Sequence, residues 1–245
     1  MSESYFSRTA LVAGDEMMRR LAAVRVLLVG IGGVGSWCAE ALVRTGIGNL
    51  TIVDRDRVAS SNINRQLPAT SSSIGRPKVD VLAERLLDIN PDLNLTKIFG
   101  FYSSDTADSF DLSSFDYVLD AIDSRDDKAL LILRATASSA TFFSSMGAAR
   151  KIDPSQVDVA EFWKVNGCAL ARSLRTYFRR NEIYPARKFK CVYSPETLPH
   201  RTLPQPDPLT GEIERANGTF AHITAQFGLT LASLVIRDLY AAHHD

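Results

Sequence analysis

The chain has 245 residues, of which 45% are hydrophobic, and its 28 lysines and arginines balance 28 aspartates and glutamates. A composition this apolar excludes a disordered chain, and a net charge of zero excludes a protein that attracts polyanions through a strong overall positive field. The length suits one large α/β domain, and we expect residues 1–245 to form a single domain.

The cysteines and the N-terminal segment bear on metal content and compartment. Cys38, Cys168 and Cys191 contain no CxxC pair, so the sequence predicts neither a disulfide scaffold nor a four-cysteine zinc site. The first residues lack the apolar stretch of a secretory signal, and no run of 18 apolar residues predicts a transmembrane segment. We therefore expect a soluble, cytoplasmic protein without structural zinc.

Strand-like and helix-like segments alternate through the first 145 residues. Short apolar runs rich in β-branched residues predict buried strands, and apolar positions three or four apart predict helices. The predicted strands are 24–29, 50–53, 94–99, 117–119 and 141–145, and the predicted helices are 36–44, 78–90 and 128–138. This alternation predicts an α/β fold with a Rossmann-like, mostly parallel sheet.

The second half of the chain is less regular. Residues 156–165 alternate like a strand, and with a short strand predicted at 190–194 they would extend the sheet by added antiparallel strands. Helices are predicted at 169–180 and 220–241. Segment 195–217 contains five prolines and a glycine, which predicts an exposed crossover loop instead of a packed element.

A glycine-rich loop joins the first predicted strand to the helix that follows it. Gly30, Gly32 and Gly35 match the pattern GxGxxG, with Gly33 between them, and such a loop lets backbone N–H groups approach a phosphate. The lysine of a P-loop NTPase is missing after it. Asp54 ends the second predicted strand, where a carboxylate can accept both ribose hydroxyls. These features predict an adenosine-containing ligand and leave NAD and ATP open.

The polar residues that follow favour ATP. Asn62 and Arg65 lie in the loop after the second strand, and Lys78 opens the next helix. Two cations beside the nucleotide suit an enzyme that attacks an α-phosphate, because negative charge builds there in the transition state. Asp120 and Asp123 follow the fourth strand at the edge where α/β proteins bind ligands, and one of them is a candidate Mg²⁺ ligand.

Together these motifs resemble a known family. GxGxxG at 30–35, Asp54, the NxxRQ pattern at 62–66, Lys78 and Asp123 are similar to those of the adenylating enzymes related to ubiquitin-activating enzymes and to the activators of thiamine- and molybdopterin-synthesis sulfur carriers. Within that family the chain most resembles the dehydratases of threonylcarbamoyladenosine in tRNA, from about residue 6 to 240. The supporting stretches are 30–48, 75–91, 120–124, 151–156 and 191–196.

The resemblance implies roles for individual residues. Asp54 would hold the ribose of ATP, Arg65 and Lys78 its phosphates, and Asp123 the Mg²⁺ ion. The family's members act as homodimers, and Arg8 matches the arginine that some of them send into the partner's ATP site. The implied catalytic residues are therefore Arg65, Lys78, Asp123 and Arg8, in an ATP-dependent ligase or adenylating enzyme.

The implied reaction is the ATP-dependent cyclisation of threonylcarbamoyladenosine beside the tRNA anticodon, through an acyl-adenylate. The alternative is adenylation of the C-terminus of a ubiquitin-like sulfur carrier. Both share the first half-reaction, so the ATP motifs do not separate them, but the missing zinc cysteines favour RNA. A third interpretation is a nucleotide-binding adaptor without catalysis. Whether a cysteine desulfurase or another sulfur-relay protein is a partner stays open.

Local charge adds a second indication of RNA. Arg172, Arg175 and Arg179 are three and four residues apart, so they share one face of a predicted helix. A basic face beside an RNA-modifying site would contact phosphates, and we expect these arginines to bind tRNA. Cys191 lies where some relatives carry a reactive cysteine, but we predict a buried structural thiol, because no neighbour in sequence would lower its pKa.

Overall fold

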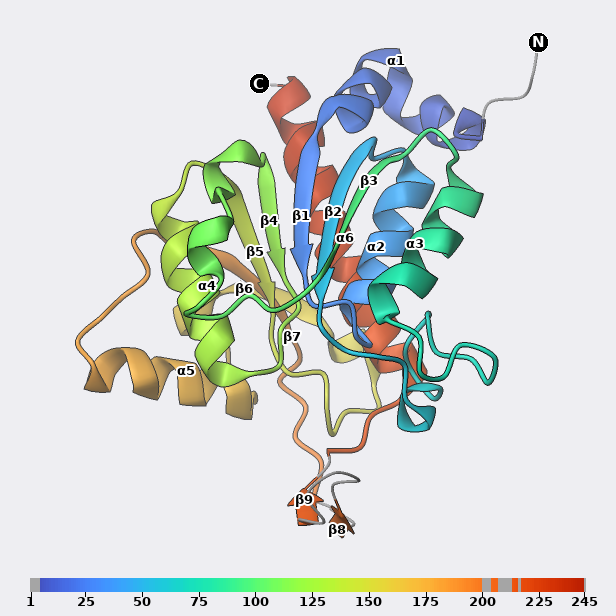
Figure 1. The fold of residues 1–245 in the computed structure, drawn as a ribbon. Helices are drawn as coiled ribbons and strands as arrows, with labels where there is room; N and C mark the ends of the chain where they lie inside the picture. Colours follow the sequence, from blue (N-terminus) through green and yellow to red (C-terminus); the bar gives the residue numbers. More distant parts are fainter. Residues whose placement is uncertain (1–4, 200–203, 207–212, 216, 245) are drawn as a thin grey trace.

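The computed structural model describes residues 5–199, 204–206, 213–215 and 217–244. Its main sheet has seven strands in the order β3-β2-β1-β4-β5-β7-β6, all parallel except that β6 pairs antiparallel with β7 (Figure 1). The strands are β1 (Arg25–Val29), β2 (Asn49–Asp54), β3 (Asn94–Phe99), β4 (Tyr117–Asp120), β5 (Thr141–Ser145), β6 (Asp158–Glu161) and β7 (Lys190–Tyr193). This arrangement confirms the predicted Rossmann-like sheet with an antiparallel extension.

Helices cover both faces of the sheet (Figure 1). They are α1 (Ser7–Ala23), α2 (Gly35–Thr45), α3 (Lys78–Ile89), α4 (Arg125–Ala137), α5 (Ala169–Arg180) and α6 (Ala221–His244). Helices α1, α2, α3 and α6 share one hydrophobic core with the sheet, and α4 and α5 share the other. The 24-residue α6 packs mainly against α2, which confirms its interpretation as a core element.

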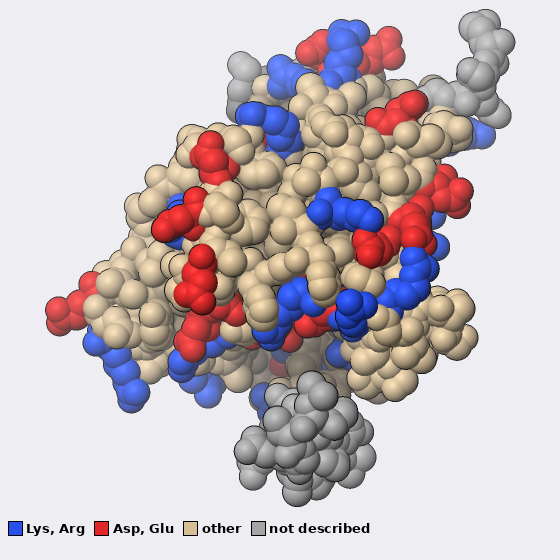
Figure 2. All heavy atoms as spheres, in the orientation of Figure 1, with Lys and Arg blue, Asp and Glu red and all other residues tan. Residues whose placement is uncertain are grey.

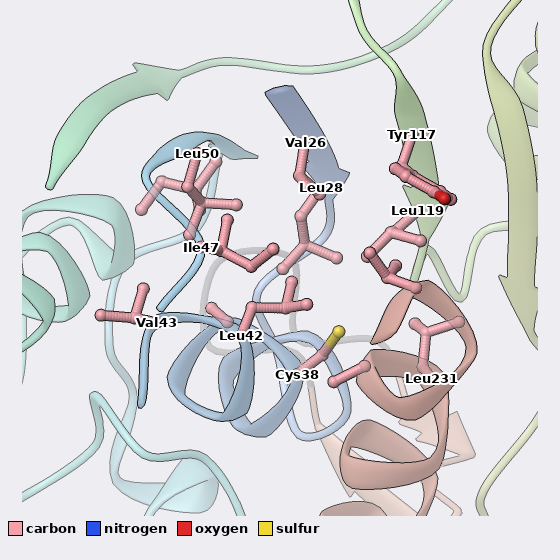
Figure 3. Packing of buried hydrophobic residues seen from close by; sticks show 14 of the residues in the cluster. Val26, Leu28, Cys38, Leu42, Val43, Ile47, Leu50, Tyr117, Leu119 and Leu231 are labelled. Atoms are coloured by element: carbon pink, nitrogen blue, oxygen red, sulfur yellow. The ribbon is translucent and has the colours of Figure 1, made fainter. Parts of the chain in front are cut away.

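The two cores divide the strand residues by alternation. Val26 and Leu28 of β1 face α2 and α6, whereas Leu27 and Val29 face the opposite layer. Figure 3 shows the first set, with Val26 and Leu28 beside the α2 residue Leu42. Because consecutive side chains of a strand point to opposite faces, a strand buried on both sides must be apolar throughout. This is why the central strands were predictable as unbroken hydrophobic runs.

Two regions of the main fold differ from the sequence predictions. Helix α1 was not predicted, because Gly14 adopts φ +77° and kinks it, and the exposed Leu11 and Val12 blur its apolar face. The strand predicted at 156–165 is wrong in extent: only Asp158–Glu161 is a strand, between the 3₁₀ turns Pro154–Gln156 and Phe162–Lys164.

The segment predicted as an exposed crossover loop, 195–217, lies partly outside the described residues. Where it is described, it contains two short strands, β8 (Pro204–Pro206) and β9 (Ile213–Arg215), paired antiparallel. Figure 1 places this pair beyond the carboxyl ends of the main sheet's parallel strands.

Candidate functional site

A cavity of about 700 Å³ opens at the carboxyl ends of β1, β2, β4 and β5. This is the edge where open α/β sheets bind ligands, and the volume lies in the range of small-molecule sites. The structure brings together in its wall most of the residues predicted to bind the nucleotide. They are Gly30, Gly32, Gly33, Asp54, Asn62, Arg65, Lys78 and Asp123.

The glycine loop is packed so tightly that two of its positions admit no side chain. Gly30 has φ +87°, and a Cβ on it would lie 2.8 Å from the carbonyl oxygen of Ala121. A Cβ on Gly35 would lie 1.8 Å from the carbonyl oxygen of Gly30. Gly35 is therefore not in the cavity wall; it lets α2 begin directly behind the loop, with the N-terminus of that helix at the site.

Asp54 is fixed by its neighbours in an orientation suited to a ribose. Its Oδ2 accepts a hydrogen bond from the backbone N–H of Ile31 (2.8 Å), and its Oδ1 accepts one from that of Asp56 (2.8 Å). Burial raises the pKa of this carboxyl, although the Lys78 ammonium and the two backbone donors oppose the shift. The carboxylate thus joins the glycine loop to the end of β2 and still lines the cavity.

Two cations lie in the cavity wall. Lys78 is the first residue of α3, its side chain is 5% exposed, and its Nζ lies 2.8 Å from Oδ2 of Asp56. Arg65 donates from Nη1 to the carbonyl oxygen of Ser61 (2.8 Å) and to Oδ1 of Asn64 (2.9 Å). Burial lowers the pKa of Arg65, and the negative charge of Asp123 opposes that shift.

Asn62 and Gln66 complete the loop after β2. Oδ1 of Asn62 accepts a hydrogen bond from the backbone N–H of Ala59 (3.1 Å), so its amide shapes the loop that carries Arg65. Oε1 of Gln66 is buried in the cavity wall without a hydrogen-bond partner. An unsatisfied buried acceptor costs free energy unless a ligand donates to it.

The structure separates the two aspartates at the end of β4. Asp120 is fully buried: its Oδ2 lies 2.8 Å from Nζ of Lys128 and 2.6 Å from Oγ of Ser144. Its Oδ1 accepts a hydrogen bond from the N–H of Ile122 (3.0 Å), so it holds the turn into α4. Asp123 of that turn lines the cavity and is therefore the aspartate available to a metal ion.

Lys128 is a residue whose importance the sequence did not reveal. Its side chain is fully buried, and Nζ also donates to the carbonyl oxygen of Ile122 (2.8 Å). The only signal was a lysine at the start of a mostly apolar predicted helix, where an exposed charge is the ordinary expectation.

The set of donors and acceptors in the cavity wall fits ATP. Arg65, Lys78 and the N-terminus of α2 present positive charge and N–H groups that can bind phosphates. Asp54 presents a carboxylate that can accept hydrogen bonds from a ribose, and the unpaired Oε1 of Gln66 can accept one from the ligand. Asp123 also fits Mg²⁺, which binds nucleotides through one or two carboxylates together with phosphate oxygens. Among the described residues, however, no group of three His, Cys, Asp or Glu side chains could hold a metal by itself.

A match to a protein family accompanies this geometry. The model of the ThiF family matches residues 6–243. This chain belongs to the ThiF family.

Within the ThiF family, this chain is similar to tRNA threonylcarbamoyladenosine dehydratases. The tRNA threonylcarbamoyladenosine dehydratase of Haemophilus influenzae is 36% identical over 244 residues, which cover 97% of this chain and 94% of the relative. That of Escherichia coli K12 is 34% identical, with coverage of 96% and 93%. The structure of the E. coli dehydratase in complex with ATP matches with a TM-score of 0.86 at 32% identity, covering 98% of this chain and 95% of the other.

Arg8 lies far from the cavity of its own chain. It is exposed on α1, and Figure 1 places α1 at the end of the sheet opposite the carboxyl ends of β1 and β2. Within one chain of this ThiF-family protein, Arg8 therefore does not join the other predicted catalytic residues. The prediction that it acts in a partner's site stays a prediction.

The predicted RNA-binding arginines all lie on α5, but they differ in solvent exposure and in their contacts within the chain. Arg172 and Arg179 are exposed. Arg175 is partly buried, and its Nη1 donates to the backbone carbonyls of Phe162 (3.1 Å) and Val165 (2.8 Å). The structure thus gives Arg175 a structural role within the basic helix. Leu170, at the beginning of α5, lines the cavity, so this helix begins beside the nucleotide site.

The cysteines lie apart from the site chemistry. All three are buried, and burial raises the pKa of Cys191 well above its ordinary value, as is typical of a structural thiol. This agrees with the prediction of a structural role. In the described part of the chain, no helix is long and apolar enough to cross a membrane.

Proposed function

We propose that this ThiF-family chain is an ATP-dependent enzyme that dehydrates threonylcarbamoyladenosine in tRNA to its cyclic form. The observation that carries the proposal is the cavity that gathers Asp54, Arg65, Lys78 and Asp123 at one edge of the sheet. Dehydratase relatives that match nearly the whole chain support the choice of substrate. The match to the E. coli molybdopterin-synthase adenylyltransferase covers only 30% of this chain.

The first step joins the substrate to AMP. A carboxylate oxygen of the threonyl group attacks the α-phosphorus of ATP, the bond to the β-phosphate oxygen breaks, and pyrophosphate leaves. The carboxylate is already ionised at neutral pH, so this step needs no general base. Arg65 and Lys78 would neutralise the charge that builds on the phosphoryl oxygens, and the rigid cavity would hold the two reactants together.

The second step closes the ring. A nitrogen of the carbamoyl group attacks the activated carbonyl carbon, loses its proton, and expels AMP, which carries away one oxygen of the former carboxylate. The sum of both steps is loss of one water from the nucleoside and conversion of ATP to AMP and pyrophosphate. Because bonds to AMP both form and break in the cycle, we place the chain among the adenylating, ligase-like enzymes.

Two further components belong to the proposal. Asp123 would bind a Mg²⁺ ion, which supplies positive charge to the phosphates when it is bound. The chain would act as a homodimer in the cytoplasm, with Arg8 of each chain reaching the ATP site of its partner.

Mass spectrometry of tRNA nucleosides, after incubation of tRNA with the protein and ATP, tests this function. We expect threonylcarbamoyladenosine to lose one water, with release of AMP and pyrophosphate in equal amounts. Unchanged nucleosides would overturn the proposal. Pyrophosphate exchange that depends on a small carrier protein with a free C-terminal carboxylate would then support the sulfur-carrier alternative.

A further inference from the structure

Two exposed aromatic rings lie beside the basic helix α5. Trp163, in the 3₁₀ turn Phe162–Lys164, is 36% exposed, and Tyr184, after α5, is 54% exposed. Their ring centroids are 6.2 Å apart, and the guanidinium of Arg179 lies 5.6 Å from the centroid of Trp163. Exposed aromatic faces combined with arginine are the chemistry on which unpaired nucleic-acid bases stack.

Buried contacts hold this turn in place. Phe162 is fully buried against the rings of Phe178 and Phe189, with centroids 5.9 and 5.1 Å away. Arg175 ties the same turn to α5 through the carbonyl oxygen of Phe162. The adjacent Trp163 consequently stands on a rigid support with part of its ring in solvent. A fixed ring loses little conformational entropy when a base stacks on it.

Further exposed cations lie on α5 and close in sequence to the two rings. Lys164, Arg172, Arg180 and Lys188 are all exposed, and none of them makes an ion pair within the described residues. Figure 2 shows Lys and Arg side chains at the lower left, where Figure 1 places α5, with Asp and Glu side chains beside and above them. Local positive charge of this kind suits a phosphate backbone.

The position of α5 connects these rings to the nucleotide cavity. Leu170 lines the cavity, and Arg179 follows it nine positions later in the same helix. At 1.5 Å per residue, Arg179 beside the Trp163 ring lies about 14 Å along α5 from Leu170 in the cavity wall. RNA lying along α5 could therefore stack one base on the rings while a neighbouring nucleotide enters the site.

We propose that Trp163 and Tyr184, with Arg179, form a stacking platform for unpaired bases of the tRNA anticodon loop. Arg172, Arg180, Lys164 and Lys188 contact the phosphates around it, and Arg175 positions the turn that carries Trp163. The choice of this ligand rests on the function proposed above. It adds residues that bind the RNA through bases outside the nucleotide being modified.

Binding of an anticodon stem–loop to the full chain, measured at several salt concentrations, tests the platform. Trp163→Leu and Tyr184→Leu should each weaken binding roughly 10-fold without changing its salt dependence, because stacking releases no counterions. Trp163→Phe, which keeps an aromatic face, should bind within about 3-fold of wild type. Tyr240→Leu, an exposed aromatic on α6 at the opposite end of the sheet, is the matched control and should bind normally.

The cations have a different expected signature. Changing Arg172, Arg180 and Lys188 together to Gln should lower the slope of log affinity against log salt by about 2, because three phosphate contacts are lost. Trp163→Leu binding as tightly as wild type would overturn the platform, even where the wild-type protein dehydrates tRNA. Conversely, a wild-type protein that binds the stem–loop through Trp163 but releases no AMP would overturn the proposed function alone.

Discussion

At the scale of single residues, some charged side chains of the site face the cavity and others are buried behind it. Arg65 and Lys78 lie in the cavity wall, and each is held by oxygen atoms that fix its direction. Asp123 lies in the same wall, whereas Asp120, only three residues earlier, is sealed in the core. Preorganised charges of this kind stabilise a transition state more than mobile ones, since they need no rearrangement as the reaction proceeds.

Arg65→Ala should therefore lower the rate of AMP formation by about 10²–10³-fold, a range typical for loss of one preorganised donor. The fold should be retained, because Arg65 is not part of either hydrophobic core. Steady-state assays of AMP release and thermal unfolding check both expectations. Arg19→Ala, an exposed arginine on α1, is the control. Full turnover by Arg65→Ala would remove this residue from the site.

At the scale of elements, the turn between β4 and α4 depends on the buried pair of Asp120 and Lys128. Both side chains are fully buried, so loss of one partner leaves an uncompensated charge in the core. Lys128→Met should lower the free energy of unfolding by about 3–5 kcal/mol, measured by chemical denaturation. Lys97→Met, which breaks the exposed pair with Asp80, should cost less than about 1 kcal/mol. Equal losses would refute this ranking.

Strand β1 is tied to the start of β4 by a pair that titrates. The Arg25 guanidinium and backbone N–H hold the pKa of Asp116 below its ordinary value of 3.8. A lowered pKa in the folded state means that the stabilisation is present above pH 3.8 and is lost as the pH falls through the folded pKa. Asp116→Asn should therefore reduce the unfolding midpoint at pH 7 but have no effect well below pH 3.8. Urea titrations at both pH values would show whether the difference disappears.

The element scale also shows which parts of the molecule could be predicted. Strands β1 and β4 were predicted to within one residue of their observed bounds, because two-sided burial leaves a continuous apolar run. The glycine loop and Asp54 could also be predicted, because a phosphate-binding turn and a ribose-binding carboxylate need particular residue types at fixed positions along the chain. The separate roles of Asp120 and Asp123 were not, because they depend on a lysine in the next helix. Trp163 was missed because its exposure depends on the packing of Phe162 beneath it.

At the scale of the whole molecule, the distance between Arg8 and the cavity makes the proposed dimer testable. If Arg8 acts in the partner's site, a dimer of one Arg8→Ala chain and one Arg65→Ala chain contains one intact site. Mixing the two inactive variants should then restore part of the activity, measured as AMP release. Each variant alone should stay inactive in this assay. No recovery after confirmed subunit exchange would contradict a role for Arg8 in the partner's site.

The close packing of the glycine loop against Ala121 has a consequence for how the protein is made. Gly30 and Ala121 are far apart in the chain, yet their contact leaves no room for even a methyl group. Because Ala121, Ile122 and Asp123 also line the cavity, the nucleotide site is incomplete on the emerging polypeptide until β4 has been synthesised and has inserted beside β1. ATP binding by ribosome-bound chains of increasing length should begin only after the turn that follows β4 has left the exit tunnel.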